Sequence, residues 1–227
     1  MTENKVLVGI HQPNFIPWMG YFNKIKISDV FVILDDVDIV LNSSKAITHR
    51  ARVKSPQGAN WLTLPLQKVD GKVINQQLLL QEDGWKAEML NNIYHFYRKA
   101  QNFDSTYNLV ESIISSDEIN LSKYNTNGII KICNHLQIDT PIYIASELNV
   151  DYSCKNTRLI ELTKAVKGTT YVSGKGGQSY NNEDLFAKEN LDIVYPHYQQ
   201  EVYEQMNGDF IPGLSIIDFL FNTVEIK

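Results

Sequence analysis

The alternation of apolar and polar stretches along the chain predicts an α/β protein. Residues 6–10 and 30–34 are short apolar runs typical of buried parallel strands, and apolar residues at helical spacing lie between them. Strand, helix and strand in so short a span indicate a βαβ unit. The pattern returns late in the chain, with strands expected at 141–145, 170–173 and 191–195 and helices at 18–27, 157–166 and 182–188.

The middle of the chain has a different pattern. Residues 50–54 and 61–65 alternate on either side of a Pro-Gln-Gly turn, which predicts an antiparallel hairpin. We expect a further strand at 73–80 and helices from 85 to 136, and a last helix capped by Ser215. We therefore predict a single α/β domain over 1–227, with a three-layer, Rossmann-like, mostly parallel sheet and an inserted hairpin and helical region at about 50–138.

Charge and cysteine content narrow the functional classes. The 227 residues carry 21 Lys and Arg against 26 Asp and Glu, a net charge of −5, which argues against nucleic-acid binding. Two widely spaced cysteines, Cys133 and Cys154, indicate a reducing compartment. No signal peptide and no run of about 18 apolar residues occurs, so we expect no transmembrane segment and a cytoplasmic location. The polar loops at the strand ends, described next, predict a small-molecule substrate.

The polar loop after the first predicted strand is the leading candidate for a binding site. Gln12 and Asn14 can each donate and accept hydrogen bonds, two prolines stiffen the loop, and His11 adds a titratable ring. Tyr21 follows in the predicted helix. The alternative is that His11 and Asn14 only cap that helix.

Acidic residues follow the second predicted strand. Asp35 and Asp36 come directly after it and can face the same sheet edge as His11, where carboxylates suit Mg²⁺ or sugar hydroxyls. Asp36 and Asp38 together would be a metal-binding pair. A solvated turn explains the same residues without a site.

A glycine-rich segment lies between the predicted strand at 170–173 and the helix at 182–188. Its glycines let backbone N–H groups approach an anion, and its lysine adds charge. The motif is neither Walker A nor GxGxxG, and a flexible turn is the alternative. The candidate phosphate-binding residues are Ser173, Gly174, Lys175, Gly176, Gly177 and Tyr180.

Basic residues gather on the first predicted hairpin strand and just before it: Lys45, His49, Arg50, Arg52 and Lys54. The period of a strand places the last three on one face, where arginine suits bidentate contact with phosphate. A solvated strand face is the alternative.

Five blocks taken together resemble the WbqC-like family: HQPNFIPWMGYFNKI, DVFVILDDVDI, SPQGANWLTLPL, YVSGKGGQSY and LSIIDFLFN. The resemblance covers residues 9 to about 222. It implies a role in bacterial O-antigen or related surface-polysaccharide biosynthesis, with glycyl or other aminoacyl transfer to a sugar suggested for some members.

A weaker resemblance is to the nucleotidyltransferase-like α/β fold, in which an HxGH motif holds ATP phosphates. The matching stretch here is 18–21, which keeps Gly20 and lacks both histidines. ATP or a nucleotide-sugar with Mg²⁺ is therefore an open cofactor candidate, and adenylation would need other residues, such as His11, Arg50 or Lys175, to bind the phosphates.

Our leading hypothesis is an aminoacyl (glycyl) or acyl transferase acting on an amino sugar or nucleotide-sugar. In it His11 is a general base or phosphate ligand, Gln12 and Asn14 orient substrate, and Asp35 and Asp36 bind Mg²⁺ or hydroxyls. One alternative is a nucleotide-sugar glycosyltransferase with a metal held by Asp36 and Asp38. The other is a non-catalytic binding or assembly protein of the same pathway.

Overall fold

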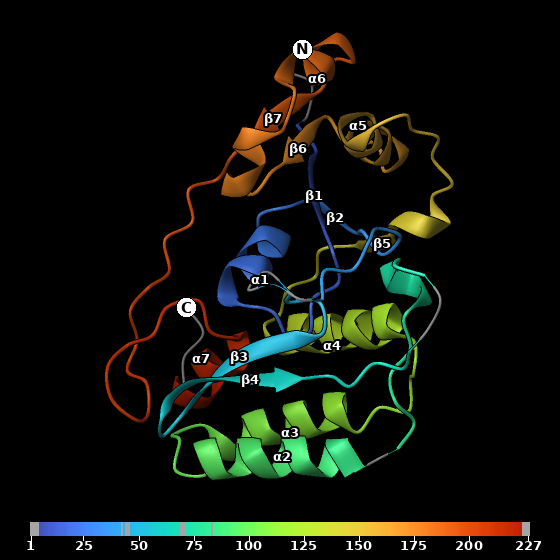
Figure 1. Cartoon of the computed structure of the whole chain (residues 1–227). Helices are drawn as coiled ribbons and strands as arrows, with labels where there is room; N and C mark the ends of the chain where they lie inside the picture. The colour runs from blue at the N-terminus through green and yellow to red at the C-terminus, as the bar shows by residue number, and fades with distance from the viewer. Residues whose placement is uncertain (1–4, 42, 44–45, 69–70, 83, 224–227) are drawn as a thin grey trace. The chain divides into compact units, whose positions relative to one another are not determined.

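The computed structural model describes residues 5–41, 43, 46–68, 71–82 and 84–223, and the chain forms two compact units (Figure 1). The first consists of Met1–Gln12, Gly20–Asp36 and Ile138–Gln199. The second consists of Pro13–Met19, Val37–Gln137 and Gln200–Lys227. The insertion expected at about 50–138 therefore falls almost wholly in the second unit, which also takes up the C-terminal segment.

A five-stranded sheet forms the first unit, in the order β5-β2-β1-β6-β7. Every pair of neighbouring strands in it is parallel. This confirms the predicted α/β class and mostly parallel sheet. The strands are β1 (Leu7–His11), β2 (Val30–Ile33), β5 (Ile142–Ile144), β6 (Thr170–Val172) and β7 (Asp192–Val194).

Helices cover both faces of this sheet, because apolar side chains project from it in both directions. Helix α1 (Met19–Lys26) packs Tyr21 edge-on against Phe31, with ring centroids 5.6 Å apart. Gly9 lies opposite Phe31, and a Cβ there would come within 2.7 Å of the Phe31 ring. The other face, which includes Val8, packs against α5 (Lys155–Ala165) and α6 (Glu183–Lys188).

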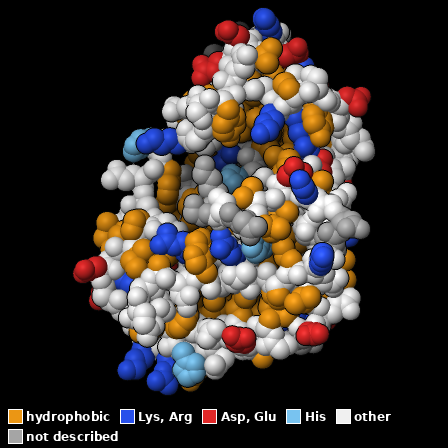
Figure 2. Space-filling model, in the orientation of Figure 1, with side chains coloured by type: hydrophobic (Ala, Val, Ile, Leu, Met, Phe, Trp, Pro, Cys, Tyr) orange, Lys and Arg blue, Asp and Glu red, His pale blue; other side chains and the backbone are white. Residues whose placement is uncertain are grey.

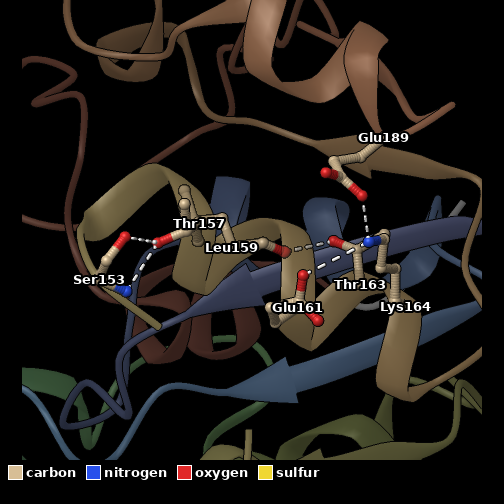
Figure 3. Close-up of polar contacts among 7 residues, drawn as sticks. All are labelled: Ser153, Thr157, Leu159, Glu161, Thr163, Lys164 and Glu189. Carbon is tan, nitrogen blue, oxygen red and sulfur yellow. Dashed lines mark hydrogen bonds and ion pairs between the residues drawn. The ribbon is translucent and has the colours of Figure 1, made fainter. Parts of the chain in front are cut away.

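Helix α5 is fastened at both ends by short polar contacts (Figure 3). Near its start the Thr157 hydroxyl accepts a hydrogen bond from the Ser153 N–H at 3.1 Å. In its last turn Lys164 pairs with Glu161 of the same helix and with Glu189, which directly follows α6. Of these contacts, the pair between Lys164 and Glu189 joins α5 to the end of α6, and the apolar side chains of both helices pack on the sheet.

The second unit surrounds a hairpin, β3 (Arg50–Ser55) with β4 (Gly58–Thr63), paired antiparallel as predicted. Its helices are α2 (Gly84–Tyr97), α3 (Phe103–Ile114), α4 (Leu121–His135) and α7 (Ile216–Asn222). Ser215 caps α7 as expected, accepting from the Ile217 N–H. No helix of the described residues is long and apolar enough to cross a membrane.

The prediction of a strand at 73–80 was wrong. This segment forms a 3-10 turn, η1 (Ile74–Gln76), with isolated bridges at Val73, Leu78 and Leu79. The cause is the buried Gln77, whose side-chain amide donates to the Gly71 and Val73 carbonyls and folds the segment back on itself.

Candidate functional site

The strand order of the first unit identifies one point at the carboxyl edge of its sheet. From β1 the chain passes to β2 on one side, whereas β6 pairs with β1 on the other side. Open α/β sheets bind ligands where the strand order reverses in this way, outside the carboxyl ends of the two strands. In this chain that point lies between the end of β1, at His11, and the end of β6, before Ser173.

His11 is held in a defined orientation at this edge. Its Nδ1 lies 3.2 Å from the Gln12 carbonyl, which only accepts, so Nδ1 carries the proton and Nε2 is the acceptor nitrogen of the neutral ring. The Tyr21 hydroxyl donates to the same carbonyl at 3.0 Å, and the two rings meet edge to face. Burial, with the nearby charge of Lys24, lowers the His11 pKa to about 3. The imidazole is therefore neutral at physiological pH.

Lys24 is a site residue that the sequence did not reveal. Its Nζ donates to the Ile10 carbonyl at 2.7 Å and lies 5.6 Å from the centroid of the Tyr171 ring. Because Ile10 belongs to β1 and Tyr171 to β6, the amine lies at the point where the strand order reverses. Burial lowers the Lys24 pKa to about 7. The one available signal was its place three residues after Tyr21, on the same side of the predicted helix.

The glycine-rich segment lies at the same edge, after β6. It forms a 3-10 turn, η3 (Lys175–Ser179), and Lys175 and Tyr180 are exposed. Gly174 and Gly176 face open space, whereas a Cβ on Gly177 would come within 2.0 Å of the Ser173 Oγ. Close packing therefore requires glycine at only one of the three positions.

Two acidic residues of the predicted site are already engaged within the first unit. Both Asp35 oxygens accept from Ser146, one from its N–H at 3.0 Å and one from its hydroxyl at 2.7 Å, which ties the ends of β2 and β5 together. Asp36 forms an ion pair with Arg158 of α5. The geometry thus gives both carboxylates partners that compete with a metal or a sugar.

The arrangement fits a metal poorly. Among the described residues, no three His, Cys, Asp or Glu side chains come together as a set of metal ligands. Asp38 belongs to the second unit, where its backbone bridges to Val73. Because Asp36 is neutralised by Arg158, its carboxylate does not suit the role of a Mg²⁺ ligand.

Other predicted residues line a small hollow within the second unit. Its walls include Asn14, Trp18, Arg50, Arg52, Trp61 and Ser215. The Arg50 guanidinium lies 4.6 Å from the centroid of the Trp61 ring, and the Arg52 guanidinium lies 5.8 Å from it. Basic and hydrophobic side chains lie next to one another near the β3–β4 hairpin (Figure 2).

The remaining basic residues do not join this hollow. Lys54 is 1% exposed, and its ammonium donates to Gln205 and to the Gly208 and Asp209 carbonyls. It therefore anchors a loop within the second unit. His49 is buried, and burial followed by the charge of Arg50 lowers its pKa. Lys45 lies outside the described residues.

The opening block is divided between the units. His11 and Gln12 belong to the first, and Pro13 and Asn14 to the second. The second unit holds its part of the block through Asn125 of α4, whose amide donates to the Pro13 carbonyl at 2.9 Å and to the Thr48 carbonyl at 2.7 Å.

Comparisons with known proteins find similarity along nearly the whole chain. The model of the WbqC-like protein family matches residues 12–226. The chain is 31% identical to the uncharacterized protein Rv1507c of Mycobacterium tuberculosis over 219 aligned residues. The alignment covers 95% of this chain and 93% of the relative. No solved structure matches the chain significantly.

Proposed function

The chain belongs to the WbqC-like protein family, and on this premise we propose that it is a transferase of bacterial surface-polysaccharide biosynthesis. It moves an aminoacyl (glycyl) or other acyl group from an activated donor to the amine of an amino sugar or nucleotide-sugar. The observation that carries the proposal is that the Lys24 amine, bonded to the Ile10 carbonyl, and the neutral His11 ring both lie where the strand order reverses between β1 and β6.

Lys24 suits the general base that such a transfer needs. A general base works best when its pKa is near the operating pH, and the Lys24 pKa of about 7 meets that condition. Its neutral amine still has N–H groups to donate to the Ile10 carbonyl while its lone pair accepts a proton. The His11 pKa of about 3 makes that ring too weak a base, so we assign it the orientation of substrate.

The transfer step follows from these roles. The acceptor amine attacks the carbonyl carbon of the donor, a C–N bond forms, and the bond between the acyl group and its leaving group breaks. The leaving group departs with the bonding pair, and the proton lost by the amine passes to the Lys24 Nζ. Backbone N–H groups of the segment after β6, around Gly174 and Gly176, are the candidates for binding a phosphate of donor or acceptor.

The test is transfer of a glycyl group to nucleotide-linked amino sugars, with glycyl-adenylate as a pre-activated donor and, in parallel, glycine with ATP; the product is detected by mass spectrometry. We expect kcat/KM of the wild-type protein to rise with pH through about 7, as Lys24 loses its proton. Lys24→Met should remove this rise and lower kcat/KM by about a hundredfold or more. Lys26→Met, on the exposed side of the same helix, is the matched control.

Two results would contradict the proposal at different levels. If Lys24→Met keeps the wild-type rate and pH profile, Lys24 is not the base. If the wild-type protein acylates no amino sugar while remaining folded, the transferase activity itself is rejected.

The glycosyltransferase alternative is not favoured, because the Asp36 carboxylate that it needs is paired with Arg158.

A further inference from the structure

The hollow in the second unit is built by three segments that are distant in the sequence. The loop after Pro13 forms one wall, β3 and β4 form another, and Gly213 and Ser215 close it. Two hydrogen bonds fix this arrangement: the Ser215 N–H donates to the Arg52 carbonyl at 2.7 Å, and the Ser215 hydroxyl donates to the Ile16 carbonyl at 2.6 Å. The walls are thus held in place before any ligand arrives.

Positive charge is concentrated in this hollow in a chain whose net charge is −5. Arg50 and Arg52 project from the same face of β3, and both guanidinium groups lie against Trp61. No carboxylate of the described residues forms an ion pair with either arginine. Two half-buried like charges side by side are unfavourable unless an anion compensates them.

Arg50 is oriented by the protein itself. Its Nε donates to the Ala46 carbonyl at 3.1 Å, and its Nη2 donates to the Ser43 carbonyl at 2.6 Å. These bonds use only part of the five N–H donors of a guanidinium. The group is therefore fixed while it keeps donors for an anion.

Asn14 is the second, independent sign of a ligand. Its side chain is 0% exposed, and neither amide atom has a hydrogen-bond partner among the described residues. Yet Asn14 lines the hollow. A buried amide without partners is costly, and such groups are otherwise almost always bonded. A ligand that displaces the side chains now covering this amide would supply the missing partner.

We propose that this hollow binds the phosphate or diphosphate group of a small molecule. Arg50 and Arg52 bind its oxyanion, and the Asn14 amide hydrogen-bonds to an oxygen of the same ligand. Guanidinium groups match phosphate oxygens in geometry, and their fixed positive charge attracts the anion. The proposal concerns the second unit alone and does not depend on the transferase activity.

The experiment is calorimetric titration of the full chain with inorganic pyrophosphate, and in parallel with malonate as a dicarboxylate of similar size. We expect pyrophosphate to bind and its affinity to fall as salt is raised. Arg52→Gln should weaken binding by about tenfold or more, because a charge-assisted contact is lost. Arg52 is the better target, since the side chain of Arg50 also holds the Ala46 and Ser43 carbonyls.

Arg98→Gln is the matched control, because it removes the same charge from an exposed position just after α2 in the same unit. It should change the affinity less than about twofold. The proposal is overturned if the wild-type protein does not bind pyrophosphate, if Arg52→Gln binds it as tightly as the wild type, or if malonate binds and pyrophosphate does not. Circular dichroism of each variant ensures that lost binding is not lost folding.

Discussion

Replacing Lys24 by methionine should change how the stability of this protein depends on pH. Methionine keeps an unbranched side chain of similar length and removes the amine that donates to the Ile10 carbonyl. Burial lowers the Lys24 pKa from 10.5 to about 7 in the folded protein, whereas an unfolded chain keeps the ordinary value. Between these two pH values the unfolded state therefore binds more protons than the folded state.

The sign and size of the effect follow from this difference. Because the unfolded state binds the proton more tightly, Lys24 lowers the free energy of unfolding. This destabilisation is complete below pH 7 and disappears as pH rises toward 10.5. Between about pH 7 and pH 9 the folded lysine loses its remaining half proton while the unfolded one stays charged, so its contribution to the free energy of unfolding rises by about 2 kcal/mol. The lost bond to the Ile10 carbonyl adds an offset of about 1 kcal/mol at every pH.

The measurement is urea-induced unfolding of wild type and Lys24→Met at several pH values from 6 to about 9. Other titrating groups are common to both proteins, so the difference between the two free energies isolates Lys24. That difference should shift by about 2 kcal/mol in favour of the wild type as pH rises from about 7 to 9. Lys26→Met should show no such shift. A pH-independent difference for Lys24→Met would refute the burial argument and remove the support for Lys24 as a base.

Two further predictions concern packing. Gly177→Ala should destabilise the protein by about 1–3 kcal/mol in urea unfolding, because the added Cβ would meet the Ser173 Oγ. Gly176→Ala is the control and should change the free energy of unfolding little, because that position faces open space. Equal effects of the two substitutions would contradict the packing argument. Asn14→Leu should raise the free energy of unfolding by about 1–3 kcal/mol, because a buried amide without partners is replaced by an apolar group of similar size, and should weaken pyrophosphate binding. A strong loss of stability would instead show that the Asn14 amide is bonded in the free protein.

Much of the fold was readable from local pattern. Short apolar runs such as 6–10 and 30–34 are typical of strands buried on both faces, and the structure has strands there, β1 and β2. The hairpin and the Ser215 cap were predicted for equally local reasons. The strand predicted at 73–80 was wrong because the turn there depends on hydrogen bonds of the buried Gln77 side chain. The spacing of apolar residues does not reveal such bonds.

The candidate site could be predicted only in part from the local sequence pattern. That His11 and Ser173 lie where strands end was predictable, because polar residues follow apolar runs. That β1 and β6 are neighbours, and that the strand order reverses there, required the strand pairing. The sequence also could not show that Asp35 bonds to Ser146, 111 residues away, or that Asp36 pairs with Arg158.

By itself, then, the sequence determined the class of fold, the order of its elements and the polar loops that follow its strands. Only the tertiary structure decided which of those loops share an edge, which charges are compensated, and that Lys24 is a partly buried amine near His11. The physical reason is the sequence separation over which each interaction acts. Periodicity and capping act between residues a few positions apart, whereas desolvation and charge pairing depend on groups that meet only when the chain is folded.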